Sequence, residues 1–224
     1  MASVMAPSSS HPIWGLNGIM HGMALKRNGR RTIVMNPQYK HLQRPAKVYG
    51  HNDITVGRWF PYQLCAVWHG AHGASQARIS GDQTQGAYSI IVSCEHEDLD
   101  RDLGELLYYS GSNSHTDTNP RSPPPSRDGT LCLHAPLASQ RPVRVLRSHS
   151  GRSPFAPTKG LRYDGLYRVT GLSTPRNMKG GLYEQFRLER IGVEEDELQV
   201  SIERCKVRPN GQDLRDYERI EQGY

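Results

Sequence analysis

The sequence lacks any apolar run long enough to cross a membrane, and it contains little cysteine. No stretch approaches the roughly 18 consecutive apolar residues of a transmembrane helix, so no membrane partner is expected. The first 20 residues hold neither a basic residue nor a clean apolar block, which makes them a poor signal peptide. The four cysteines, at positions 65, 94, 132 and 205, are scattered. This scatter favours reduced thiols in a soluble intracellular protein over a disulfide framework.

Motifs for catalysis and for metal binding are also missing. No serine or cysteine lies in a nucleophile elbow, and the acidic residues lack the lysine, or the histidine with asparagine, of a metal-dependent nuclease. The pairs Cys94–His96 and Cys132–His134 would each face one way on a strand, but their spacing is not that of structural zinc sites. His69 and His72 lack a third ligand. The sequence therefore predicts no enzyme, no metal and no cofactor.

Acidic residues are absent from the first 50 positions, which hold seven lysines and arginines. Within them, the cluster KRNGRR at 26–31 is typical of a nuclear address or of an arm that contacts phosphates, and a solvated basic linker is an equally good interpretation. The segment 141–190 is basic too, with eleven lysines and arginines against three acids. Because the whole chain carries net charge +6, a polyanionic partner is expected, most often nucleic acid.

Between the two basic segments lies an acidic run, EHEDLDRDLGE, at 95–105. It is followed by two tyrosines and a serine, Tyr108 to Ser110. Asp and Glu are the side chains that accept a hydrogen bond from the exocyclic amine of cytosine. They can surround a base in this way only after the base has left the duplex and entered a pocket. The ordinary alternative for such a run is a solvated loop.

Segments typical of strands dominate the middle of the chain. They are apolar or alternate with period two, and they lie at 88–94, 143–147, 163–172 and 182–191. The 22 glycines and 15 prolines favour short strands with irregular connections over a helical bundle. The loop 112–130 is long enough to be functional or disordered. We therefore expect an α+β domain, mainly β, with a curled or barrel-like sheet.

This pattern divides the chain into three parts. Residues 1–46 are predicted to be a basic, weakly structured extension with a short helix near 18–26. Residues 47–210 form the β-rich domain. Residues 211–224 are a tail with one short helix, because Leu214, Tyr217 and Ile220 share a helical face.

Five motifs, taken together, resemble one known family. Tyr163-Asp164-Gly165 is accompanied by segments at 56–72, 86–93, 100–112 and 141–147, in the order and rough spacing of the YDG, or SRA (SET- and RING-associated), domain family. The resemblance covers about residues 49–192. It implies a PUA-like, curved β-barrel with flanking helices. It also implies a non-catalytic domain that binds double-stranded DNA containing 5-methylcytosine and flips the methylated base into a pocket. A nuclear location, with chromatin proteins as further partners, follows from that activity.

The resemblance also assigns roles to single residues. Asp100 pairs with the base, and Asp98 is the alternative because the acidic segment is one residue longer than in the family. Tyr109 and His96 stack on the base, and Ser110 lines the methyl group. The pocket is completed by Ser93 and Ser112. Two loops enter the duplex, one near Gln76 and Arg78, the other within 112–130 at Asn119, Arg121 and Arg127. The Tyr-Asp-Gly motif itself is interpreted as structural: Tyr163 closes the core, while Asp164 and Gly165 shape the turn into the strand that follows.

Two departures from the family pattern keep other functions open. His96 replaces a tyrosine, and Arg78 stands where a glycine is usual. A degenerate SRA fold could serve as a protein-interaction module or as a non-specific DNA binder. A third hypothesis is the DNA-recognition part of a modification-dependent nuclease, for whose catalytic domain the sequence is expected to have no room.

Overall fold

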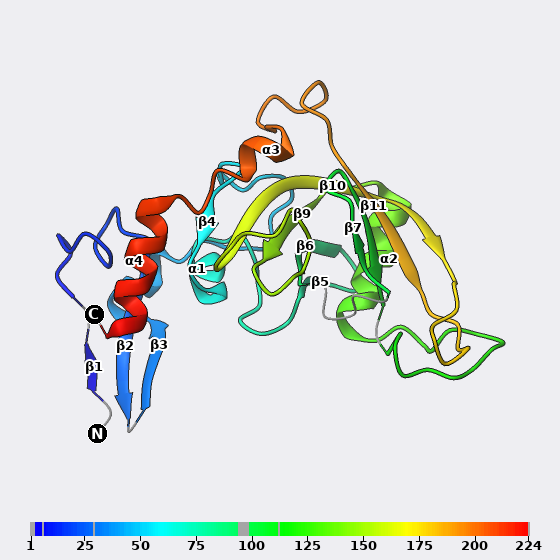
Figure 1. Cartoon of the computed structure of the whole chain (residues 1–224), viewed down its shortest axis with the longest axis horizontal. Coiled ribbons are helices and arrows are strands. Elements are labelled where there is room, and N and C mark those ends of the chain that lie inside the picture. Colours follow the sequence, from blue (N-terminus) through cyan, green and yellow to red (C-terminus); the bar gives the residue numbers. More distant parts are fainter. Residues whose placement is uncertain (1–2, 6, 29, 94–98, 112, 224) are drawn as a thin grey trace.

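A computed structural model of the chain describes residues 3–5, 7–28, 30–93, 99–111 and 113–223. The described elements form a small sheet near the N-terminus and a large mixed sheet with short helices around it (Figure 1). In chain order they are β1 (Ser3–Met5), β2 (Met23–Asn28), β3 (Arg30–Met35), η1 (Pro37–Leu42), β4 (Trp59–Phe60), α1 (Gln63–Trp68), β5 (Ile79–Asp82), β6 (Gly86–Val92), β7 (Arg101–Asp102), β8 (Leu106–Ser110), α2 (Asp128–Ser139), β9 (Val143–Ser148), β10 (Leu161–Ser173), β11 (Gln185–Arg190), α3 (Ile202–Cys205) and α4 (Gly211–Gln222).

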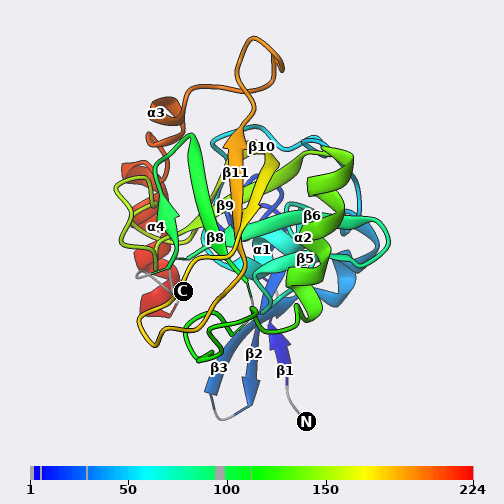
Figure 2. The same cartoon turned by 90° about the vertical axis from the view of Figure 1, so that its right-hand side faces the viewer.

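The large sheet has the strand order β5-β6-β9-β10-β11-β8-β7, and β4 adds to one end of β10. Its pairs are antiparallel except for β6 with β9, which run parallel. The long strand β10 arches over the molecule and curves the sheet, as Figures 1 and 2 show from two sides. The predicted architecture, mainly β with a curved sheet and few helices, is confirmed. Within the described residues, the helices are too short and too polar for any to span a membrane.

The two adjacent inner strands β6 and β9 are buried along their whole length. A strand covered on both faces reads as a nearly continuous apolar run, as YSIIV does in β6. The strand β9 does not have the half-buried pattern expected from its alternating valines and arginines, because Arg144 and Arg147 are fully buried as well.

The Tyr-Asp-Gly motif lies inside β10 rather than at a turn, so the expected turn-shaping role of Asp164 and Gly165 is wrong. The pairing of β10 with β9 shifts register between Tyr163 and Leu166, and Gly165 takes a φ of +101° within this bulge. The Asp164 carboxylate, fully buried, accepts from Arg147 Nη1 and from Arg162 Nη2, each at 2.8 Å. Asp164 therefore pairs with two buried guanidinium groups. Tyr163 is fully buried and does close the core, as expected.

The second buried carboxylate in this cluster is Asp102, which pairs with Arg147 through two bonds of 2.8 Å. Burial alone would raise the pKa of Asp102, but the hydrogen bonds and charge of Arg147 bring that pKa below its ordinary value. Tyr167, the hydrogen bonds of Asp102 and the charges of Asp164 and Asp102 raise the pKa of Arg147 against the effect of its own burial. Several arginines of segment 141–190 therefore stabilise the fold from inside.

The N-terminal segment is not weakly structured. Instead of the expected short helix near 18–26, strand β2 occupies 23–28 and pairs with β1 and β3. The physical reason is apolar burial, since five of its side chains belong to the main hydrophobic core: Ile13, Trp14, Met20, Met23 and Leu25. Gly22 has φ +84° and lies against the Trp68 ring, where a Cβ atom would overlap the ring.

The C-terminal tail forms α4, where the sequence predicts a helix. Asn210 and Asp213 make a capping box at its start. The helix lies beside the β2–β3 hairpin (Figures 1 and 2), and Arg31 Nη2 donates to the carbonyl of Ile220. Thus the two ends of the chain pack together and share one core.

Candidate nucleic-acid interface

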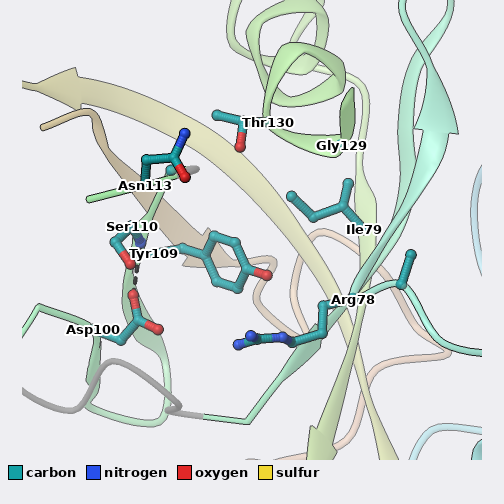
Figure 3. A pocket seen from close by; sticks show the side chains of 10 residues that line it. Arg78, Ile79, Asp100, Tyr109, Ser110, Asn113, Gly129 and Thr130 are labelled. Carbon is teal, nitrogen blue, oxygen red and sulfur yellow. Dashed lines mark hydrogen bonds between the residues drawn. The ribbon is translucent and has the colours of Figure 1, made fainter. Parts of the chain in front are cut away.

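A pocket of about 210 Å³ opens between the end of β8, the first turn of α2 and the residues that lead into β5 and β7 (Figure 3). It is smaller than the roughly 300–1,000 Å³ of drug-sized ligand sites, which suits a single small ring. The lining residues are Ala77, Arg78, Ile79, Asp100, Tyr109, Ser110, Gly111, Asn113, Gly129 and Thr130.

Asp100 is placed by the hairpin of β7 and β8. The register pairs Arg101 with Tyr108, so the residue before β7 comes level with the end of β8. There Asp100 Oδ1 accepts from the backbone N–H of Ser110 at 2.7 Å (Figure 3). Gly104 lets this hairpin turn tightly, since it takes a φ of +81° under the Phe155 ring. The carboxylate is thus held by backbone geometry at the pocket wall.

Tyr109 and Ser110 form the wall next to this carboxylate. Tyr109 is buried, pairs with Phe186 of β11, and turns its ring toward the pocket (Figure 3). The hydroxyl oxygen of Ser110 is buried and has no hydrogen-bond partner in the described part of the chain. An unpaired buried hydroxyl is unfavourable by about 1–3 kcal/mol, which a bound polar group would relieve.

Arg78 extends into the same pocket from the side opposite Asp100 in the view of Figure 3. Its Nη1 donates to Ser93 Oγ at 3.0 Å. The pocket therefore presents an acceptor group and a guanidinium donor to one small space.

His72, which is fully buried, holds the loop that carries Arg78. His72 Nε2 lies 2.9 Å from the Ala77 carbonyl, and Nδ1 lies 2.8 Å from Ser89 Oγ on β6. The carbonyl can only accept, so Nε2 carries the proton and Nδ1 accepts from the serine hydroxyl. Burial lowers the pKa of His72 to about 4, which keeps this arrangement neutral near pH 7.

The structure brings together four of the residues singled out in the sequence: Asp100, Tyr109, Ser110 and Arg78. Ser93 joins them through its hydrogen bond to Arg78. Gln76 is exposed and does not line the pocket. Three further candidates, His96, the alternative Asp98 and Ser112, lie outside the described residues.

The loop residues Asn119, Arg121 and Arg127 are exposed and lie away from the pocket lining. Asn119 Oδ1 accepts from the N–H of Arg121, so these two residues form a local turn. Arg127 is the residue that precedes α2. None of the three lines the pocket.

The first turn of α2 is the part of the site that the sequence did not indicate. Gly129 and Thr130 line the pocket there, and a Cβ atom at Gly129 would lie 2.8 Å from the Cβ of Ile79. In the sequence, the signal for this part of the site was the glycine that follows the prolines of the long loop. The same helix contains Cys132 and His134, so these residues do not share a strand face. His134 pairs with Glu184 at 3.2 Å, and no cluster of metal-binding side chains occurs among the residues described.

Comparisons with known proteins identify one family and several relatives. The SAD/SRA domain profile matches residues 48–193. A UHRF1-like protein of Cryptococcus neoformans var. grubii serotype A is 32% identical over 150 residues, which cover 61% of this chain and 44% of that protein. The chain spans less than half the length of the curated relatives it matches.

Two solved structures share the fold at sequence identities of 30% and 27%. The modification-dependent TagI restriction endonuclease gives a TM-score of 0.54 at 30% identity, over 66% of this chain and 54% of that chain. The SUVH5 SRA structure in complex with methylated CHH DNA gives 0.53 at 27% identity, over 65% of this chain and 94% of that chain.

Proposed function

Since the chain belongs to the SAD/SRA domain family, we propose that it is a non-catalytic reader of 5-methylcytosine in duplex DNA that flips the modified base into the pocket beside Asp100. The observation that carries this proposal is the fixed Asp100 carboxylate next to the Tyr109 ring. The SUVH5 SRA structure bound to methylated DNA supports it, because nearly all of that chain is matched.

In this proposal, Asp100 accepts from the exocyclic amine of cytosine. A thymine would present a carbonyl oxygen to the same carboxylate and would be repelled. Stacking on Tyr109 contributes about 1–3 kcal/mol, and the unpaired Ser110 hydroxyl gains a polar neighbour. These terms offset the few kcal/mol needed to extrude a base from the stack.

The methyl group itself contributes little. Full burial of one methyl is worth about 0.8 kcal/mol, which is a factor of about four in affinity. A larger preference for methylated DNA therefore requires that the pocket close around the methyl group and exclude water. A reader of this kind works on chromosomal DNA, so the proposal includes a nuclear location and association with chromatin.

The test is a binding titration on three matched duplexes, unmethylated, hemimethylated and fully methylated at one CpG, in about 150 mM salt. We expect tighter binding to a methylated duplex. The variant Asp100→Asn should lose this preference and bind methylated DNA about 10- to 100-fold more weakly. The side-chain NH2 of asparagine can face the exocyclic amine of cytosine, and two donors form no hydrogen bond. Asp216→Asn on α4 removes the same charge far from the pocket and should behave as the parent.

Equal affinity of the parent for all three duplexes would reject methyl recognition and leave a non-specific DNA binder. A retained preference in Asp100→Asn would show that Asp100 does not pair with the base. No binding to any duplex would favour a protein-interaction module.

A further inference from the structure

The positive charge of this protein is concentrated outside the part that matches the SAD/SRA family. Residues 1–47 carry net charge +7, residues 48–193 hold 16 basic and 13 acidic residues, and residues 194–224 hold 5 basic and 9 acidic residues. The family match begins at residue 48. The matched domain therefore carries net charge +3 only, and the larger part of the long-range attraction to a polyanion comes from the N-terminal segment.

Basic residues of the central domain are also partly unavailable to a phosphate. Arg144, Arg147 and Arg162 are fully buried. Arg147 and Arg162 are neutralised by carboxylates, while Arg144 donates to the carbonyls of residues 46, 50 and 71. The side chain of Arg190 is almost wholly buried too. These four side chains are therefore not available for surface contacts to a DNA backbone.

The N-terminal segment folds into an arm of paired strands and is not a loose tail. Met23, Ala24 and Leu25 at the base of β2 are buried, and the strand pairs with β1 on one side and β3 on the other. Beyond them, the basic residues of the cluster at 26–31 lie on the two strands toward the end of the hairpin, with Arg27 paired to Arg31. Figures 1 and 2 show β2 and β3 extending away from the large sheet. A preformed arm can bind without the ordering entropy that a disordered tail loses.

A basic groove lies next to the pocket. Lys40, Arg44 and Lys47 line a groove of about 330 Å³ together with His72, Gly73 and Ser80. Lys40 and Lys47 are exposed. The segment 72–80 forms one wall of this groove, and its residues Ala77 to Ile79 line the base pocket. The basic groove and the base pocket therefore share the segment 72–80 as a wall.

We infer that the β2–β3 hairpin and this groove bind the phosphate backbone of duplex DNA beside the recognised base, and so extend the interface beyond the family domain. The inference rests on the proposed function for the identity of the polyanion. The arm supplies affinity that does not depend on methylation, since phosphate contacts carry no sequence information. The base pocket supplies the selectivity.

Salt dependence tests the arm separately from the pocket. The variant Lys26→Gln/Arg27→Gln/Arg30→Gln leaves in place Arg31, which contacts α4. On a duplex of about 24 base pairs, the slope of log K against log salt should become shallower by about 0.9 for each phosphate that the variant no longer neutralises. Affinity for methylated and unmethylated duplexes should fall by the same factor. A second variant, Lys40→Gln/Lys47→Gln, should do the same to a smaller degree.

The matched control is Arg168→Gln/Arg204→Gln/Lys206→Gln, which removes equal charge near α3 and the loop after β11. It should leave the slope within about 0.3 of the parent value if only local contacts matter. On a duplex of about 10 base pairs centred on the CpG, the hairpin variant and the parent should converge, because the flanking phosphates are gone.

The outcomes separate the two proposals. An unchanged slope in the hairpin variant, with methyl preference intact, overturns the arm and leaves the reader. A shallower slope in a chain without methyl preference supports the arm and removes the reader. Equal effects of the hairpin and control variants mean that only net charge acts, which also overturns the arm.

Discussion

At the scale of single residues, the pocket combines one acceptor with one charged donor. The Watson–Crick edge of cytosine has an amine donor at one end and two acceptors, N3 and O2, beside it. Asp100 matches the donor, and Arg78 enters the same pocket with a guanidinium group. The pocket remains open with Arg78 in place, so this arginine lines the site without filling it.

Replacing Arg78 therefore should weaken binding of the base. For Arg78→Ala we expect about 10-fold or greater loss of affinity for methylated duplex, because a hydrogen bond from a charged group contributes about 1.5–3 kcal/mol. Arg78→Lys keeps the charge but not the planar guanidinium, so its affinity should lie between those of the parent and Arg78→Ala. Titration of the three proteins on the hemimethylated duplex measures this series. Tighter binding by Arg78→Ala would instead identify the guanidinium as an obstacle to the base.

At the scale of elements, the site depends on how the segment 72–80 is attached to the sheet. His72 bonds the Ala77 carbonyl and the Ser89 hydroxyl, and Gln63 Nε2 donates to the carbonyls of Ala74 and Ala77. These bonds fix the backbone that carries Arg78. The histidine is the titratable group in this attachment, so it should make the attachment sensitive to pH.

The pKa of His72 is lowered from 6.5 to about 4 in the folded protein, and burial is the main cause. Below about pH 6.5 the unfolded chain takes up a proton that the folded chain refuses. The free energy of unfolding should therefore fall as the pH drops from 6.5 to 4, by up to about 1.4 kcal/mol per pH unit from this residue. Above pH 6.5 its contribution is constant.

Urea unfolding at pH 7, 6 and 5 checks this expectation in the parent and in His72→Gln. The variant should be less stable at pH 7, yet its stability should depend less steeply on pH because one linked proton is missing. Parallel curves for the two proteins would mean that His72 does not titrate on unfolding.

At the scale of the whole molecule, the sequence predicted the central domain better than its ends. Apolar runs and alternation located β6, β9, β10 and β11, since these strands bury their side chains in regular patterns. The resemblance placed Asp100 and Tyr109 in one pocket. The hairpin register that brings them together was not readable from periodicity.

Two features depended on contacts between distant residues and could not be predicted. Asp164 looked like a turn residue because Asp-Gly is a frequent turn pair, but its carboxylate balances Arg147 and Arg162 inside a strand. The N-terminal segment looked unstructured because glycine, serine and basic residues surround its few apolar side chains. Trp14 and Met20 belong to the same core as Trp68 and Ile220, which are distant in the sequence.

This shared core gives the last prediction. Deleting residues 1–35 removes five buried side chains, each worth about 1.5–3 kcal/mol, from a core that also contains Trp68 and Ile220. Their sum is comparable to the roughly 5–15 kcal/mol that stabilises an ordinary domain. We expect the chain 36–224 to lose its cooperative thermal unfolding transition, although the family match lies entirely within it. Deleting only residues 1–6 removes the short edge strand β1 and should keep the transition within a few degrees of the parent. If chain 36–224 melts cooperatively at the parent temperature, the N-terminal segment is an attachment to the domain and not part of its core.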